Sequence, residues 1–169
     1  NELINNQYKY PIKGICFYTN GLYNNASHFI NLMQYWFGDV KKIVNIEYDY
    51  FLNYKTNKAD FILNFESGPI NFFSIPNEEY THNQIKIFFE SGLLTSKKQC
   101  SKFFFRKIVT DDKLPQYKVI SDKFHTFENS MNVYQYNVFN HLRDNLLNLN
   151  NNICTGEEAL LTLKCLDNI

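Results

Sequence analysis

The 169-residue chain is 44% hydrophobic and 17% aromatic, a composition that fits one folded domain with a sizeable core and excludes a disordered chain. Lysine plus arginine and aspartate plus glutamate both number 17, so the formal net charge is zero. A neutral chain gives no electrostatic reason to expect a nucleic acid or an anionic membrane as a partner. No apolar run in the sequence is long enough to span a bilayer.

The first two thirds of the chain alternate between apolar and polar residues, which is typical of β-strands. This pattern predicts strands over 13–18, 40–50, 59–65, 69–74, 83–89, 93–95, 102–110 and 117–121. One helix interrupts the strands, because apolar residues recur at helical spacing from Ala26 to Phe37. Asn24 and Asn25 are expected to cap its start, and Gly38 is expected to end it.

The final third of the chain changes to helical spacing. A helix is predicted over 131–149, and a second one after the capping box formed by Thr155 and Glu158. The buried stripe of the last helix is expected to comprise Ala159, Leu160, Leu163 and Leu166. The order of elements predicts an α+β fold with an open, mainly antiparallel sheet and helices packed on one face. The other face would carry aromatic residues such as Phe72 or Phe104 and would meet solvent or a partner.

His28 is the strongest candidate for a chemical role. It lies in the expected first turn of the 26–37 helix, where the electropositive helix end disfavours an imidazolium. A neutral imidazole there could accept a proton from a hydroxyl group, with Asn24 orienting the ring or the substrate. Tyr18, Asn20 and Asn25 flank the same turn and are expected to bind substrate. The alternative is that His28 and Asn24 are ordinary residues of a helix start.

Other candidate groups are weaker. Arg106, within a predicted strand, could pair with a substrate phosphate or with an acidic neighbour in the protein. The remaining histidines and the cysteines show no metal-ligand or redox spacing, so no metal is expected. They are His82, His125, His141, Cys16, Cys100, Cys154 and Cys165. The sequence shows no signal peptide, so reduced cysteines in a cytoplasmic protein are expected.

The glycines of the chain never fall in a G-x-G spacing. The chain therefore lacks the phosphate-cradling loop of a dinucleotide fold or a P-loop, and this chain alone is not expected to bind a nicotinamide dinucleotide. The sequence begins at Asn1 rather than Met. We therefore expect it to be a piece of a longer or processed protein.

The stretch from Gly21 to Val40 (GLYNNASHFINLMQYWFGDV) resembles the glucose-fructose oxidoreductase/inositol dehydrogenase (Gfo/Idh/MocA) family. In that family a turn leads to Asp, three residues, His, and an apolar helix ending in Gly. Three later stretches are similar to the family as well, so the resemblance spans nearly the whole chain. They are ADFILNFESG from Ala59, FFESGLL from Phe88 and TGEEAL from Thr155.

The resemblance implies that residues 1–169 form the C-terminal, substrate-binding and oligomerisation domain of a two-domain enzyme. An N-terminal Rossmann domain, absent from this chain, would bind NAD or NADP and supply a catalytic lysine. The resemblance assigns His28 to the catalytic His and places Asn24 where the family has Asp; an amide cannot exchange a proton. The substrate would be a sugar or nucleotide-sugar, and the open sheet face would form a homo-oligomer. The alternative is a non-catalytic binding or oligomerisation domain with the same fold.

Overall fold

The computed structural model describes residues 11–46, 59–75, 79–127, 129–147 and 153–169. The described part begins with strand β1 (Pro11–Tyr18), a π-helical turn (Leu22–Ala26) and helix α1 (Ser27–Phe37). Eight strands follow: β2 (Lys42–Ile46), β3 (Asp60–Phe65), β4 (Gly68–Ser74), β5 (Gln84–Phe89), β6 (Gly92–Lys97), β7 (Lys102–Thr110), β8 (Lys118–Ile120) and β9 (His125–Phe127). The chain closes with a 3₁₀ turn (Met131–Val133), α2 (Tyr134–Leu146) and α3 (Gly156–Leu166).

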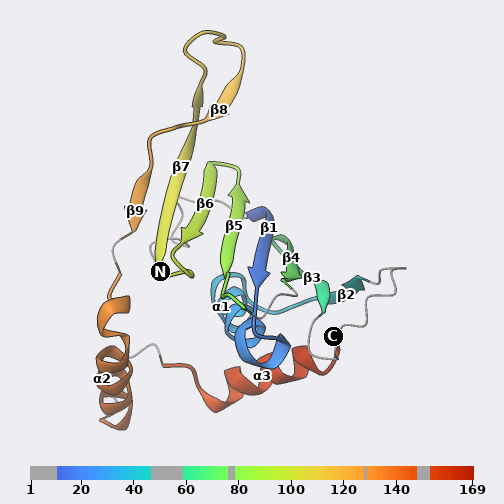
Figure 1. Ribbon diagram of the computed structural model, residues 1–169, viewed down its shortest axis with the longest axis vertical. Coiled ribbons are helices and arrows are strands. Elements are labelled where there is room, and N and C mark those ends of the chain that lie inside the picture. Colours follow the sequence, from blue (N-terminus) through green and yellow to red (C-terminus); the bar gives the residue numbers. More distant parts are fainter. Residues whose placement is uncertain (1–10, 47–58, 76–78, 128, 148–152) are drawn as a thin grey trace.

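The strands form one open sheet in the order β2-β3-β4-β1-β5-β6-β7-β8, with β9 also pairing with β7. Every pair is antiparallel except β1 with β4, which is parallel. A parallel pair needs a long crossover connection, and the chain supplies one through α1, β2 and β3. The expected α+β class with an open, mainly antiparallel sheet is confirmed (Figure 1).

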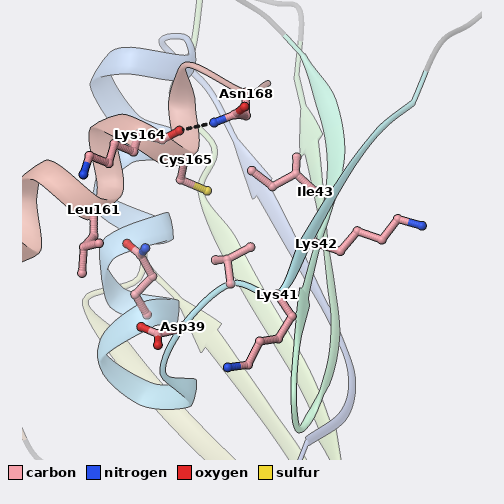
Figure 2. Close-up of a pocket in the computed structure, with 10 residues that line it drawn as sticks. Asp39, Lys41, Lys42, Ile43, Leu161, Lys164, Cys165 and Asn168 are labelled. Atoms are coloured by element: carbon pink, nitrogen blue, oxygen red, sulfur yellow. Dashed lines mark hydrogen bonds between the residues drawn. The ribbon is translucent and has the colours of Figure 1, made fainter.

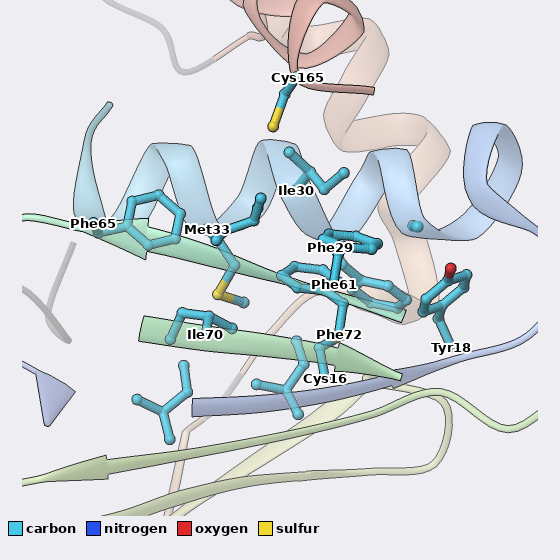
Figure 3. Close-up of a cluster of buried hydrophobic side chains, with 14 of the residues drawn as sticks. Cys16, Tyr18, Phe29, Ile30, Met33, Phe61, Phe65, Ile70, Phe72 and Cys165 are labelled. Carbon is cyan, nitrogen blue, oxygen red and sulfur yellow. The ribbon is translucent and has the colours of Figure 1, made fainter. Parts of the chain in front are cut away.

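The core lies between one face of the sheet and α1. Phe29, Ile30 and Met33 of α1 are buried, as their helical spacing predicts. They face alternate residues of the strands, among them Phe61 and Phe72, whose rings stack with centroids 4.6 Å apart (Figure 3). Apolar side chains that leave water together in this way supply most of the stability of such a layer. As expected, α1 ends at Gly38, which has φ +80° and donates its N–H to the Gln34 carbonyl.

The last helix, α3, packs against α1 with a different stripe from the one expected. Its capping box is confirmed: Thr155 and Glu158 bond reciprocally. Its buried residues, however, are Thr162, Cys165 and Leu166. Of the four stripe residues predicted from sequence, only Leu166 is buried; the other three are exposed. Cys165 and Leu166 join the hydrophobic core, and the polar Thr162 is accommodated on the same side because its hydroxyl donates to the Gln34 side chain of α1 at 2.7 Å.

Two elements stand away from the body of the fold. Helix α2 has no buried residue, although the apolar spacing of 131–149 predicts a helix there. Its apolar side chains are exposed, with Leu146 at 74% and Phe139 at 66%. The outer part of β7 and β8 form a ribbon that projects beyond the sheet (Figure 1). The expectation that the helices pack on one face therefore holds for α1 and α3, and α2 lies apart.

Several strand boundaries differ from those predicted. The strand expected over 40–50 is β2, Lys42–Ile46, and 47–50 lie outside the described residues. The short strand expected at 93–95 extends over Gly92–Lys97. Strand β9 was not predicted, because three residues are too few to show an alternation. No helix among the described residues is long and apolar enough to cross a membrane.

Candidate functional site

His28 is exposed at the start of α1. It is therefore not enclosed in the apolar core. A histidine enclosed there could not have served as a catalytic group. It lines a groove of about 1150 Å³ that runs along the outer side of α1. A general acid or base has to come within hydrogen-bond reach of the reacting group, and a side chain that lines a groove can do so.

The helix start is built differently from the prediction. Asn24 and Asn25 do not cap α1; they lie inside the π-helical turn, which begins after Gly21 and makes no side-chain cap bond. The turn is held by backbone bonds from Asn25 and Ala26 to the Gly21 carbonyl, at 3.2 and 3.3 Å. The electropositive end of the helix therefore lies at Leu22, more than one turn before His28. The sequence placed this end at His28, and that position is wrong.

The backbone around this turn is unusual. Asn20 has φ +62°, in the left-handed region that few residues other than glycine adopt. A single π-helical turn follows at once, and such turns occur often at functional sites. Asn20 and Asn24 are exposed, so both side chains lie at the surface of the helix start. Of the four candidates on this segment, His28 lines the groove, whereas Asn20, Asn24 and Asn25 are not among its lining residues.

The groove has four walls, one of which is formed by Met131 of the 3₁₀ turn and Asn145 of α2. Alongside His28, α1 contributes Tyr35 and Trp36, and the start of α3 contributes Thr155 and Glu158. The turn between β6 and β7 contributes Gln99 and Cys100. A concave surface with aromatic side chains and a few polar groups is the usual form of a small-molecule site.

A hydrogen-bond network that the sequence did not reveal joins the β6–β7 turn to the start of the helix. The Asn83 side-chain oxygen accepts the Thr19 backbone N–H at 3.1 Å and the Asn25 amide at 3.5 Å. The Asn83 backbone N–H in turn donates to the Gln99 side chain at 2.7 Å. Thr19 is buried, and its hydroxyl accepts the His82 backbone N–H. No local pattern could have found this network, because its members are far apart in the sequence.

Tyr18, which was expected to bind substrate, lies in the core. Its side chain is fully buried, and its hydroxyl donates to the Ala59 carbonyl and accepts the Ala59 N–H. Burial raises the pKa of Tyr18 from 10.0 to about 12, with smaller effects from its neighbours. In this arrangement the Tyr18 hydroxyl ties β1 to the start of β3 and does not reach the groove.

Arg106, the other substrate-binding candidate in the sheet, lies on the face opposite to α1. Its neighbour Phe105 is buried in the core, so Arg106 points the other way. The guanidinium donates to the carbonyls of Ser121 and Ile120 at 2.7 and 3.4 Å. The structure therefore separates Arg106 from His28, and its bonds fasten the β7–β8 ribbon.

A second, smaller cavity of about 600 Å³ lies between the end of α1, the start of β2 and the end of α3. Lys41, Lys42 and Lys164 line it, yet the ammonium groups of Lys42 and Lys164 point in opposite directions (Figure 2). Both helices present their C-terminal carbonyl groups here, and cations near such ends are stabilising. Lys42 and Lys164 therefore do not converge on one anion.

Neither metal-binding nor redox groups emerge in the described part of the chain. No group of three or more His, Cys, Asp or Glu side chains is placed there to hold a metal ion. The four cysteines are unpaired, and Cys154 is the exposed one. Burial raises the pKa of the Cys16 and Cys100 thiols, and that of Cys165 to about 11.

Comparisons with known proteins rest on structure. No protein-family model matches the chain, and no curated protein matches it. Among solved structures it is similar to the dehydrogenase MviM from Clostridium difficile, with TM-score 0.66 and 13% identity over 99% of this chain and 56% of that one. It is similar to the UDP-N-acetylglucosamine 3-dehydrogenase GnnA from Acidithiobacillus ferrooxidans, with TM-score 0.70 and 7% identity over 96% and 53%.

A third similar structure is the WlbA dehydrogenase from Bordetella pertussis in complex with NADH and UDP-GlcNAcA, with TM-score 0.61 and 13% identity over 95% of this chain and 52% of that one. The chain thus spans about half the length of the solved structures it matches. Identities this low establish the fold alone. The resemblance read from the sequence is confirmed at that level: the chain has the fold of one half of Gfo/Idh/MocA-type dehydrogenases, consistent with their C-terminal domain.

Proposed function

We propose that this chain is the substrate-side domain of an NAD(P)-dependent oxidoreductase that acts on a hydroxyl group of a sugar or nucleotide-sugar. The observation that carries the proposal is the match of nearly the whole chain to half of several dehydrogenases. One of these is named for a UDP-sugar substrate and another was crystallised with a UDP-sugar. Exposed His28 at the edge of a groove supplies the group that such chemistry needs.

His28 would act as the acid or base. Its imidazole would accept the proton of the reacting hydroxyl, or return it in the reverse direction. Asn24 would bind and orient that hydroxyl, since an amide donates and accepts hydrogen bonds but exchanges no proton. Asn20 and Asn25, on the same segment, would contact other substrate hydroxyls.

The chain's own residues do not fit a nicotinamide dinucleotide. The strand–turn–helix at β1 and α1 contains Gly21 alone where a phosphate-cradling loop needs several glycines. We therefore assign the binding of NAD or NADP to a nucleotide-binding Rossmann domain that completes the site, and expect no dinucleotide bound by residues 1–169 alone. A cytoplasmic location remains part of this proposal.

The test uses a polypeptide that carries both halves. We expect His28→Ala to lower turnover of a UDP-sugar with NAD or NADP by about 10²-fold or more, the usual contribution of an acid–base group. The far-ultraviolet circular dichroism spectrum and melting temperature should stay unchanged, because His28 is exposed. Arg106→Lys serves as the control, since Arg106 lies on the other face. Unchanged turnover in His28→Ala would remove this residue from the mechanism.

A second candidate function is a non-catalytic binding or oligomerisation domain. The amide of Asn24 favours it, because the resemblance read from the sequence places an Asp at this position and an amide cannot exchange a proton. Asn24→Asp separates the two: a catalytic domain should gain or keep turnover, and a domain that has lost catalysis should stay inactive. Binding of the sugar without turnover in both forms would favour the non-catalytic function.

The homo-oligomer is proposed through the open sheet face, where Phe73 and Phe104 lie half-buried and Phe88 exposed. The basic residues of this face include Lys13, Lys86, Lys97 and Lys102. Arg106 lies there as well, but its guanidinium is paired with Asp122 at 3.7 Å. Asp60 is the only acidic residue in any described strand. Two copies packed face to face would bring like charges together, so association should strengthen as salt screens them. A monomer at both low and high salt would contradict this proposal.

A further inference from the structure

The turn between β6 and β7 has a strained backbone. Lys98, Gln99 and Cys100 have φ of +50°, +55° and +63°. Side chains with a Cβ are unfavourable in this left-handed region, and such residues usually occur singly. Three in succession persist only where the surrounding structure holds them, and strain of this kind is concentrated at functional sites.

The Gln99 side chain is one of the groups that hold the turn. Its Nε2 donates to the Thr81 carbonyl at 2.6 Å, and its Oε1 accepts the Asn83 N–H at 2.7 Å. These two bonds fix the segment that leads into β5. A hairpin turn can close without side-chain bonds to a neighbouring segment. The closing of the β6–β7 hairpin therefore does not explain the two bonds of Gln99.

The link continues to the helix start. Asn83, fixed through its backbone by Gln99, directs its side-chain oxygen to the Asn25 amide in the π-helical turn at 3.5 Å and to the Thr19 N–H at 3.1 Å. That turn runs directly into α1 and His28. Gln99 also lines the same groove as His28.

We propose that Gln99 is a positioning residue: through Asn83 and Asn25 it holds the π-helical turn that sets where His28 stands in the groove. The inference deepens the proposed function, because it concerns the placement of its acting group. Gln99 itself is not a catalytic residue here.

Two matched glycine variants test it. Gln99→Gly and Lys98→Gly each relieve strain at one left-handed position. Lys98 is exposed, and the bonds that Ser101 makes to residue 98 go to the backbone carbonyl, so Lys98→Gly keeps them. Only Gln99→Gly removes the bonds to Thr81 and Asn83. Any difference between the two variants therefore reports the side-chain link and not the backbone strain.

The readout is amide hydrogen exchange, together with the imidazole resonances of His28 by NMR, in the 169-residue chain. In Gln99→Gly we expect the amides of Ala26 and Ser27 to exchange about tenfold faster and the His28 resonances to shift. In Lys98→Gly both should match the wild type. Equal exchange and equal His28 resonances in the two variants would overturn the proposal.

Asn83→Ala provides a second test should Gln99→Gly fold poorly, because it cuts the link without touching the turn. It should also speed exchange at Ala26 and Ser27, and wild-type exchange there would overturn the proposal. Neither measurement uses turnover. If His28 proves inactive, the proposed function fails while the exchange result still decides the role of Gln99.

Discussion

Replacing Tyr18 with Phe should weaken the fold without affecting the groove. The hydroxyl is fully buried and makes two hydrogen bonds to the backbone of Ala59. Phe keeps the ring and its packing but leaves the Ala59 N–H and carbonyl without this partner. Leaving buried polar groups unsatisfied costs about 1–3 kcal/mol, so the free energy of unfolding at pH 7 should fall by that amount.

The effect depends on pH in a way that identifies its origin. The Tyr18 pKa is raised by burial from 10.0 to about 12. The folded chain therefore holds its proton where the unfolded chain has lost it, so the wild type is fully stabilised below pH 10 and loses stability towards pH 12. At pH 11 this titration lowers the free energy of unfolding of the wild type by about 1.4 kcal/mol. Tyr18→Phe has no hydroxyl at this position and does not show this decrease.

Urea unfolding followed by circular dichroism at pH 7 and pH 11 measures both quantities. Other groups that titrate in this range are common to the two proteins and cancel in the comparison. The difference in the free energy of unfolding between the wild type and Tyr18→Phe should be about 1.4 kcal/mol smaller at pH 11 than at pH 7. An unchanged unfolding free energy at pH 7, or a gap that does not narrow, would refute the structural role assigned to Tyr18.

Two further predictions concern packing and thiol access. Gly92→Ala should destabilise the fold by about 1–3 kcal/mol or more in a melting experiment, because a Cβ there would lie 2.1 Å from the Arg106 carbonyl oxygen; Gly156→Ala, where a Cβ meets nothing within 4 Å, is the control and should be neutral. Iodoacetamide at pH 8 should label the exposed Cys154 first, while Cys165, with a pKa raised to about 11, should react about a hundredfold more slowly than an ordinary thiol; equal labelling of both by mass spectrometry would show that α3 does not pack as described.

The sequence predicted well what depends on local periodicity. Strand alternation and the helical spacing of Phe29, Ile30 and Met33 are dictated by which side chains leave water, so the sheet and α1 could be foreseen. The capping box at Thr155 and Glu158 is likewise a local hydrogen-bond pattern. His28 was singled out as a candidate because it lies in such a segment, and its role stays a prediction.

Features that depend on contacts between residues far apart in the sequence could not be predicted. Helix α3 buries Thr162, Cys165 and Leu166, and the bond from Thr162 to Gln34 of α1 is a contact that apolar spacing does not reveal. The π-helical turn replaced the expected caps, because Asn25 bonds to Asn83 and does not cap the helix. Arg106 was assigned to substrate by its charge and Tyr18 by its place beside the turn, whereas the sheet register sends Arg106 to the open face and Tyr18 into the core.

The central claim is that the groove beside His28, and not the open sheet face, receives a sugar nucleotide. Titrating the isotope-labelled chain with UDP-N-acetylglucosamine and following amide chemical shifts by NMR tests this claim most directly. The account predicts saturable shifts at His28 and Gln99, which line the groove, with those of Arg106 unchanged. Shifts that cluster around Arg106 and Phe104, with His28 unaffected, would contradict it.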